Sequence, residues 1–161
     1  MLLCYCGTAF GWGKSGHDAI AYIAECNLTP KAKKNIEKYL DGRSIVYYAS
    51  WMDVYRHTPA YKVTSGWHGD RVDADGKYVP NAKGDALQCI EEAISRLKDY
   101  RSLDDSTVLV SIKYLVHLVG DMHCPVHVKY PWYKNFKFDL NGRPSEFHSF
   151  WDSGVLDLNH R

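Results

Sequence analysis

The sequence between residues 116 and 127 reads Val116-His117-Leu118-Val119-Gly120-Asp121-Met122-His123-Cys124-Pro125-Val126-His127. His117 and Asp121 are four residues apart, so on a helix they project from one face, one turn apart. The rest of this helix is apolar, and a histidine and a carboxylate buried in it without partners would cost several kcal/mol. Pro125 ends the helix, and His127 brings a further imidazole back toward the pair. Each residue alone has a structural explanation, a hydrogen-bonded core histidine or a helix-end carboxylate, but together they favour a metal site.

A second histidine–carboxylate pair, His148 and Asp152, repeats the four-residue spacing near the end of the chain. A surface helix pair is the alternative, although the aromatic residues that flank the pair argue against full exposure. Imidazole nitrogens and carboxylate oxygens together are a donor set that suits zinc. Further candidate ligands of these two types lie upstream, at His17, Asp53 and His68.

The cysteines do not suggest a metal site of their own. Cys26, Cys89 and Cys124 are the three that follow the first eleven residues, an odd number that argues against a disulfide framework. One disulfide and buried free thiols both remain open. Because the sequence has no Cys-x-x-Cys motif, we expect that thiolates do not hold the zinc.

Hydrophobic periodicity and capping residues predict an all-α fold, a single mainly helical domain with long loops. Thr29 and Pro30 are expected to start a helix, Asp41-Gly42 to end it, and Asp105-Ser106 to cap the apolar helix that carries His117. We expect Ile23 on the apolar face of the first helix. The predicted helices span residues 15–27, 30–40, 45–56, 85–100 and 105–119, with a short helix over 146–152; the predicted loops span 57–84, with a short hairpin around 73–78, and 125–144.

Length and charge limit the classes of function. The 161 residues suffice for one domain with a core, and the net charge of +1 excludes a global basic field for nucleic acid. Any affinity for nucleic acid must therefore come from a local site. No run after the first residues approaches the length of a transmembrane helix.

Residues 1–11 are apolar and uncharged and end in the small-x-small pattern Ala9-Phe10-Gly11. They resemble the back half of a secretory signal peptide, with a buried N-terminal segment as the alternative. We expect cleavage after Gly11, a mature chain that begins at Trp12, and a secreted or periplasmic protein.

The motifs, taken in order, resemble the zinc-dependent single-strand nucleases of the mung-bean nuclease type, which share a superfamily with zinc phospholipase C. The resemblance covers nearly the whole chain after Gly11, as a nuclease domain over 12–161. The motifs that carry it are Trp12-Gly13…Gly16-His17, Ala49-Ser50-Trp51-x-Asp53-x-x-Arg56, Trp67-His68, Leu115-x-His117-x-x-Gly120-Asp121-x-His123-x-Pro125-x-His127 and His148-x-x-x-Asp152-Ser153-Gly154.

The resemblance implies three zinc ions in one cleft. The first is held by Asp53, His68, His117 and Asp121, and the second by His127, His148 and Asp152. The third takes His17, Asp121 and the free amino group and carbonyl of Trp12, so that Asp121 bridges two ions. An amino group binds zinc only when it is free and deprotonated, so this third site requires removal of residues 1–11.

The resemblance also implies hydrolysis of phosphodiester bonds in single-stranded DNA or RNA to 5′-phosphate products, with 3′-nucleotidase action. Asp53 orients the attacking water and Arg56 binds the phosphate, although an Asp53–Arg56 ion pair is the simpler explanation of that spacing. No stable protein partner is implied. The alternatives are a zinc phospholipase C, disfavoured because that branch usually has Glu at the position of Asp152, and an inactive zinc-binding remnant.

The sequence departs from the family pattern at three points. Gly69 and Asp70 stand where an aromatic residue usually follows the Trp-His motif, so Tyr130, Trp132 or Tyr133 is expected to stack on the substrate. Cys124 stands where a polar amide is common. The chain ends at Arg161, soon after the last ligand pair, so we expect that the family's C-terminal helices are lacking and that apolar surface is exposed.

Overall fold

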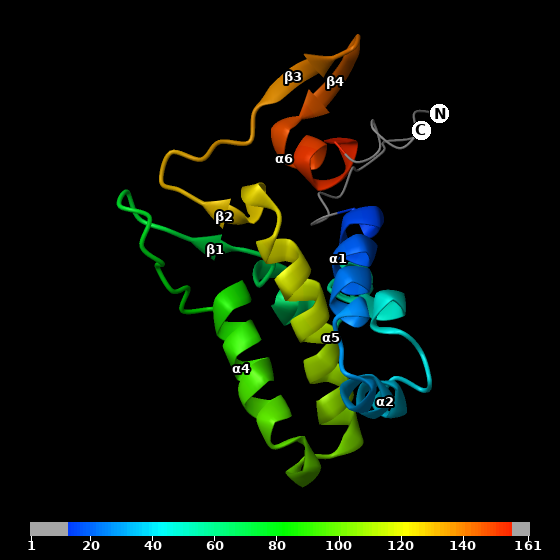
Figure 1. Ribbon diagram of the computed structural model, residues 1–161. Coiled ribbons are helices and arrows are strands. Elements are labelled where there is room, and N and C mark those ends of the chain that lie inside the picture. Colours follow the sequence, from blue (N-terminus) through cyan, green and yellow to red (C-terminus); the bar gives the residue numbers. More distant parts are fainter. Residues whose placement is uncertain (1–12, 156–161) are drawn as a thin grey trace.

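Helix α5 (Asp105–Met122) runs through the middle of the computed structural model, which describes residues 13–155 (Figure 1). Helices α1 (Lys14–Cys26) and α4 (Ala86–Lys98) pack on either side of α5, and α2 (Pro30–Tyr39) packs near its N-terminal half. The mainly helical fold predicted from the sequence is confirmed. Short 3-10 helices lie at Ile45–Tyr48, Lys62–Gly66, Tyr100–Ser102 and Pro125–His127.

Helices α2, α4 and α5 each begin at a side chain that accepts a hydrogen bond from the first turn. Thr29 caps α2 by accepting from the amide of Ala32, with Pro30 in the first helical position as predicted. The prediction that Asp105 and Ser106 cap α5 is wrong by one residue, because Asp104 accepts from the amide of Thr107 at 2.9 Å. The first turn of α5 begins with the further acidic side chain Asp105, which favours that end of the helix dipole.

The predicted helix over 45–56 is interrupted. The chain forms a 3-10 helix over Ile45–Tyr48 and then α3 (Trp51–Tyr55), with Ala49 and Ser50 between them. This break lies against α5, where the carbonyl of Ala49 accepts a hydrogen bond from a buried histidine of that helix. The interruption therefore helps to position His117 on α5.

Two small strand pairs complete the fold. Strand β1 (Asp70–Arg71) pairs in parallel with β2 (Val128–Lys129), and the bridge between Val72 and Tyr78 confirms the short hairpin predicted around residues 73–78. The predicted loop over 125–144 is wrong in its second half, where β3 (Lys137–Leu140) and β4 (Arg143–Glu146) form an antiparallel hairpin. Its turn residues Asn141 and Gly142 both have positive φ, which the tight two-residue turn requires.

The last described helix confirms the predicted short helix over 146–152. Helix α6 (Phe147–Ser149) continues without interruption into a π-helical turn, Phe150–Gly154. This segment contacts the N-terminal end of α1, and the backbone amide of Gly13 donates to the carbonyl of Asp152. The two ends of the described chain therefore meet beside the polar end of α5.

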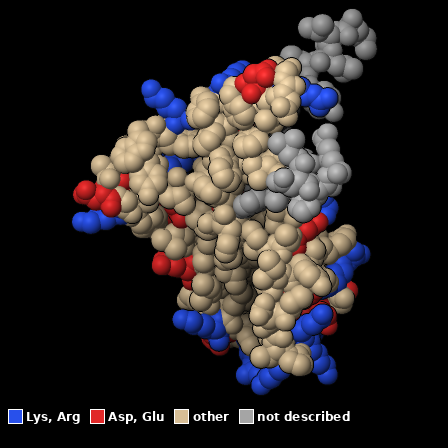
Figure 2. All heavy atoms as spheres, turned by 45° about the horizontal axis from the view of Figure 1, so that its top comes forward, with Lys and Arg blue, Asp and Glu red and all other residues tan. Residues whose placement is uncertain are grey.

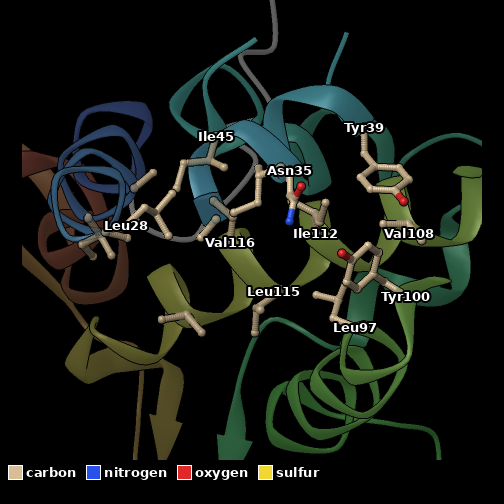
Figure 3. A pocket seen from close by; sticks show the side chains of 16 residues that line it. Leu28, Asn35, Tyr39, Ile45, Leu97, Tyr100, Val108, Ile112, Leu115 and Val116 are labelled. Atoms are coloured by element: carbon tan, nitrogen blue, oxygen red, sulfur yellow. The ribbon is translucent and has the colours of Figure 1, made fainter. Parts of the chain in front are cut away.

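The hydrophobic core consists of two clusters that both include side chains of α5. One contains Leu40, Ile45, Val108 and Ile112, and the other contains Met52 and Leu118 with residues of α4. An apolar groove of about 430 Å³ lies between α1, α2 and α5, and its lining includes Leu28, Ile45, Ile112, Leu115 and Val116 (Figure 3). No helix among residues 13–155 is long and apolar enough to cross a bilayer.

The apolar face of α1 is less buried than the sequence predicts. Ile23 is 61% exposed, and Ile20 and Ala24 line the open groove rather than a closed core. The buried positions of α1 are Gly16, His17 and Ala21. Ala21 belongs to the hydrophobic core, whereas His17 belongs to the polar cluster that α1 helps to enclose.

Candidate metal centre

Helix α5 presents a fully buried histidine and carboxylate. His117 and Asp121 are both 0% exposed, and Nε2 of His117 lies 3.3 Å from Oδ2 of Asp121. Nδ1 of His68 is 3.0 Å from both of these atoms, and Oδ1 of Asp53 is 3.7 Å from Nδ1 of His68. Side chains from α3, α5 and the loop before β1 therefore meet at one point, as the sequence predicts.

His17 reaches the same point from α1. Its ring stacks on His117 with centroids 4.1 Å apart, and its Nε2 lies 3.4 Å from Oδ1 of Asp121. Gly120 makes this approach possible, because a Cβ at that position would lie 2.6 Å from Nδ1 of His17. Asp121 thus directs one oxygen toward His17 and the other toward His117 and His68.

A second group adjoins the first. Nε2 of His127 is 3.4 Å from Oδ1 of Asp152, and Nε2 of His148 is 3.1 Å from Oδ2 of the same carboxylate. Nδ1 of His127 is 3.5 Å from Oδ1 of Asp121, which links the two groups. Asp152 and His127 are buried, and His148 is partly exposed.

The distances between the donor atoms suit the coordination of metal ions better than hydrogen bonding between the side chains. In a tetrahedral site with bonds of 2.0–2.1 Å, donor atoms lie about 3.3 Å apart, close to the separations between 3.0 and 3.9 Å found in this cluster. Buried polar atoms without a hydrogen bond are costly and rare. Such atoms gather here, at both ring nitrogens of His17, Oδ1 of Asp53, Nε2 of His68, Oδ1 of Asp121, Nε2 of His127 and Oδ2 of Asp152.

Three sets of described residues have ligand atoms close enough to share an ion. Each set places its ligand atoms within 4.8 Å of one another. The first two sets overlap at His117, which agrees with a cluster of ions rather than with separate sites. The sets are His17 with Asp53 and His117; His68 with His117 and Asp121; and Cys124 with His127 and Asp152.

Hydrogen bonds outside the cluster orient the rings. Nδ1 of His117 lies 2.7 Å from the carbonyl oxygen of Ala49, and Nδ1 of His127 lies against the carbonyl oxygen of His68. The hydroxyl of Tyr133 is 2.9 Å from Nδ1 of His148. A carbonyl can only accept, so His117 and His127 carry their proton on Nδ1 and leave the Nε2 lone pair for a metal.

The electrostatics of the cluster favour the ionised form of Asp121 and Asp152. Burial by itself would raise the pKa of Asp121, but the adjacent imidazoles of His117, His17 and His68 outweigh burial and hold that pKa well below its usual value. Burial would likewise raise the pKa of Asp152, and His127 and His148 lower it.

The pKa values of three buried histidines shift in different directions. For His117 and His127, burial favours a lower pKa, but the nearby carboxylates of Asp121 and Asp152 outweigh burial and raise the pKa of each ring. For His68, burial dominates and lowers the pKa. In the absence of metal, imidazolium–carboxylate pairs therefore supply part of the charge balance that cations supply when bound.

A cleft of about 390 Å³ opens onto the cluster. Arg56 lines it and also forms the expected ion pair, with Nη1 3.5 Å from Oδ1 of Asp53. Two further cations line the cleft, Arg71 and Lys129, which the parallel pairing of β1 with β2 brings together. The other lining residues are Ser65, Gly66, His68, Gly69, Asp70, Asn81, Asp85, His127, Tyr133, Asn135 and His148.

The cations of the cleft are a local feature. On the face shown in Figure 2, Lys and Arg side chains are scattered among Asp and Glu side chains near the edges and form no continuous basic patch. The two carboxylates that line the cleft are engaged by the backbone: Asp70 accepts from the amide of Leu87, and Asp85 accepts from the amide of Gln88. The cleft is therefore lined by three cationic and two anionic side chains, and the cations give it a slight positive excess that can attract an anion.

Of the three aromatic residues predicted to stack on the substrate, Tyr130 and Trp132 do not line this cleft. Tyr130 and Trp132 stack on each other with centroids 5.1 Å apart, and Trp132 is 62% exposed. Tyr133 does line the cleft. Gly69 stands at the position where the family pattern has an aromatic residue. The backbone there approaches the backbone of His127 closely, and a Cβ at Gly69 would lie 2.6 Å from the carbonyl oxygen of His127.

The remaining sequence predictions fall outside the cluster or outside the described residues. Trp12, the leader over 1–11 and His160 lie in the part of the chain that the structure does not describe. His57 and His123 are exposed, and Nδ1 of His123 lies 2.7 Å from the carbonyl oxygen of Val119. Cys26, Cys89 and Cys124 are free thiols, so the open question of a disulfide is settled for these three.

Comparison with known proteins agrees with this site. A model of the S1/P1 Nuclease family matches residues 12–161. The chain is 26% identical over 159 residues to Nuclease S1 of Aspergillus oryzae, an alignment that covers 91% of this chain and 55% of that protein. It is 29% identical over 157 residues to Nuclease P1 of Penicillium citrinum (88% and 57% covered) and 26% identical over 167 residues to Endonuclease 2 of Arabidopsis thaliana (91% and 57%). The chain spans about half the length of the curated relatives it matches. Because the family model covers nearly the whole sequence, the chain belongs to the S1/P1 nuclease family.

Proposed function

We propose that this chain carries the active site of a zinc-dependent endonuclease that hydrolyses phosphodiester bonds in single-stranded DNA or RNA. The observation that carries the proposal is the set of buried imidazole and carboxylate atoms without hydrogen bonds, which adjoins a cleft lined by Arg56, Arg71 and Lys129. Buried charges of this kind are tolerated when metal ions neutralise them. The relatives of the chain described above are named nucleases and endonucleases, which agrees with this chemistry.

We assign the ligands as the family resemblance implies. Asp53, His68, His117 and Asp121 hold one zinc, and His127, His148 and Asp152 hold a second. Trp12 and His17 with Asp121 hold the third, after removal of residues 1–11 from a secreted precursor. The approach of His17 to Asp121 and the hydrogen bond from Gly13 to Asp152 support this arrangement, because they bring the start of the described chain to the cluster.

The protein's own groups have distinct roles in this proposal. Zinc, when bound, supplies Lewis acidity at the phosphate and lowers the pKa of water toward neutrality. Asp53 accepts a proton from the attacking water and orients it, since its Oδ1 makes no hydrogen bond in the metal-free cluster. The guanidinium of Arg56 lines the cleft and donates to a phosphate oxygen there.

The depth of the site favours single strands. The proposed ligands other than His148 are less than 9% exposed among the described residues, so a phosphate held within a stacked duplex would not reach them without unpairing. We infer 5′-phosphate products and 3′-nucleotidase action from the family resemblance. A zinc phospholipase C is the alternative within the superfamily, and no contact in the cleft specifically favours it.

The test uses the chain processed to begin at Trp12. Metal content is measured by mass spectrometry, and hydrolysis is assayed on single-stranded DNA, single-stranded RNA, a duplex of the same sequence and phosphatidylcholine micelles. We expect three zinc ions per chain, cleavage of single strands that a chelator abolishes and added zinc restores, and loss of cleavage in Asp121→Asn. Turnover of lipid alone would assign the chain to phospholipase C. Fewer than three zinc ions with no hydrolysis would identify an inactive zinc-binding chain.

A further inference from the structure

Cys124 lies inside the second group of the metal centre. The residue follows α5 directly, is 0% exposed, and its Sγ lies 3.3 Å from Oδ1 of Asp152. Its sulfur, a nitrogen of His127 and an oxygen of Asp152 all lie within 4.8 Å of one another. The side chain is therefore not a core thiol among aliphatic neighbours but one corner of a polar group.

We propose that Cys124 is a ligand of the second metal ion, beside His127, His148 and Asp152. This inference rests on the metal occupancy in the proposed function but not on nuclease activity. It replaces the expectation, drawn from the absence of a Cys-x-x-Cys motif, that thiolates take no part. The motif rule considers pairs of cysteines close in sequence and overlooks a single thiol that joins histidines and a carboxylate.

The separations suit a mixed sulfur, nitrogen and oxygen site. With a Zn–S bond of about 2.3 Å and Zn–N or Zn–O bonds of about 2.0–2.1 Å, a tetrahedral site places sulfur about 3.5 Å from an oxygen donor and nitrogen about 3.3 Å from it. The structure has 3.3 Å from Sγ of Cys124 to Oδ1 of Asp152, and 3.4 Å from Nε2 of His127 to the same oxygen. Nε2 of His148 approaches the other oxygen at 3.1 Å.

Two atoms independent of the thiol point to an ion at this place. Nε2 of His127 and Oδ2 of Asp152 are buried and make no hydrogen bond among the described residues. Their residues are 3% and 1% exposed, so bulk solvent does not reach these two atoms. A cation among His127, Asp152 and Cys124 satisfies these atoms together.

A thiolate ligand would lower the net positive charge at the second metal site. Zinc displaces the thiol proton to solvent when sulfur binds, so Cys124 and Asp152 together contribute two negative charges and the ion's charge is neutralised. An ion held by His127, His148 and Asp152 alone would keep about one positive charge. The second ion is therefore bound more tightly, prefers softer metals, and attracts a phosphate oxygen less strongly than the ions of the first group.

The experiment distinguishes a ligand from a hydrogen-bond donor. The chain beginning at Trp12 is loaded with cobalt for near-ultraviolet spectroscopy and with zinc for X-ray absorption. We expect a sulfur-to-cobalt charge-transfer band and a Zn–S distance of about 2.3 Å. Both disappear in Cys124→Ser and Cys124→Ala, and both variants bind the second ion at least ~10-fold more weakly. Cys26→Ser, which removes an exposed thiol, keeps both signals.

The outcomes separate this inference from the proposed function. Full metal content and nuclease activity without any sulfur signal would overturn the inference alone, and so would restoration of normal metal affinity by Cys124→Ser, because serine keeps a donor to Asp152. A sulfur signal in a chain that cleaves no nucleic acid would support the ligand and contradict the function. A correctly folded chain that takes up no metal would contradict both.

Discussion

Replacing Gly120 with alanine would place a methyl group 2.6 Å from Nδ1 and 3.1 Å from Cε1 of His17. Restoring an ordinary contact moves the imidazole by about 0.8 Å. The ring has little room to turn, because it is 1% exposed and stacks on His117. Metal–ligand distances tolerate changes of roughly 0.2 Å, so the movement removes His17 from its ion.

The fold should survive this change. Overpacking a buried contact costs about 1–3 kcal/mol, while alanine in place of glycine inside a helix contributes about 1 kcal/mol of stability. The net loss is therefore between roughly 0 and 2 kcal/mol, a small part of the stability of a domain of this size. We expect Gly120→Ala to fold in the presence of a chelator with a modestly lower melting temperature, yet to lose one zinc ion per chain.

The assay combines zinc content by mass spectrometry, zinc titration by calorimetry and thermal unfolding in chelator. Gly66→Ala is the matched control, because a Cβ at Gly66 meets nothing within 4 Å and should leave the metal content unchanged. Full zinc content and wild-type zinc affinity in folded Gly120→Ala would refute the reasoning, since the close approach of α5 and α1 would then not position His17.

Further predictions concern pH, ring orientation and metal removal. In the metal-free chain, the raised pKa of His117 and of His127 gives stability that is present below about pH 6.5 and lost as pH rises through the folded-state pKa, and the lowered pKa of Asp121 and of Asp152 gives stability that is present above about pH 3.8 and lost as pH falls further. The stability that these four groups give the metal-free chain is therefore greatest between these values, and the lowered pKa of His68 opposes the contribution of the other two histidines. Since zinc binds neutral imidazole, the rise in melting temperature on adding zinc should be larger near pH 8 than near pH 5.5, and a rise independent of pH would contradict the assignment of histidine ligands. Tyr133→Phe removes the hydroxyl beside His148, so affinity for the second ion should fall roughly 10-fold by zinc titration; an unchanged affinity would show that the ring needs no such support. Chelator should lower the melting temperature of the wild-type chain at neutral pH by leaving buried carboxylates without cations, and equal melting curves with and without chelator would argue against any bound metal.

The parts of the site that follow local rules could be predicted from sequence. The pairs His117–Asp121 and His148–Asp152 follow from helical spacing, and the structure places the imidazole nitrogen and carboxylate oxygen of each pair 3.3 Å and 3.1 Å apart. The hairpin over β3 and β4 was also a local feature, because Asn-Gly is a strong turn signal, but the surrounding segment was predicted to be a loop.

The parts of the site that depend on distant pairing could not be predicted. Arg71 and Lys129 reach the cleft through a parallel pair that no spacing in the sequence indicates. The carbonyls of Ala49 and His68 orient imidazoles, and a backbone carbonyl is present at every residue, so no residue type marks this role. Cys124 was noticed as a departure from the family pattern, but its contact with Asp152 depends on how the last helix folds back.

The parallel pairing of β1 with β2 has a consequence for the order in which the chain matures. Strand β2 follows His127 directly and β1 follows His68 after Gly69, and the contact between those two histidines joins positions 59 residues apart. Helical contacts within α5 form early because they are local, whereas closing a long loop costs chain entropy and is slow. A newly synthesised chain therefore has one weak site on α5, with His117 and Asp121 as its two donors, long before the other ligands assemble around it. We therefore expect the chain to take up metal late in folding, when β1 pairs with β2. A metal ion that binds earlier remains exchangeable until these strands pair.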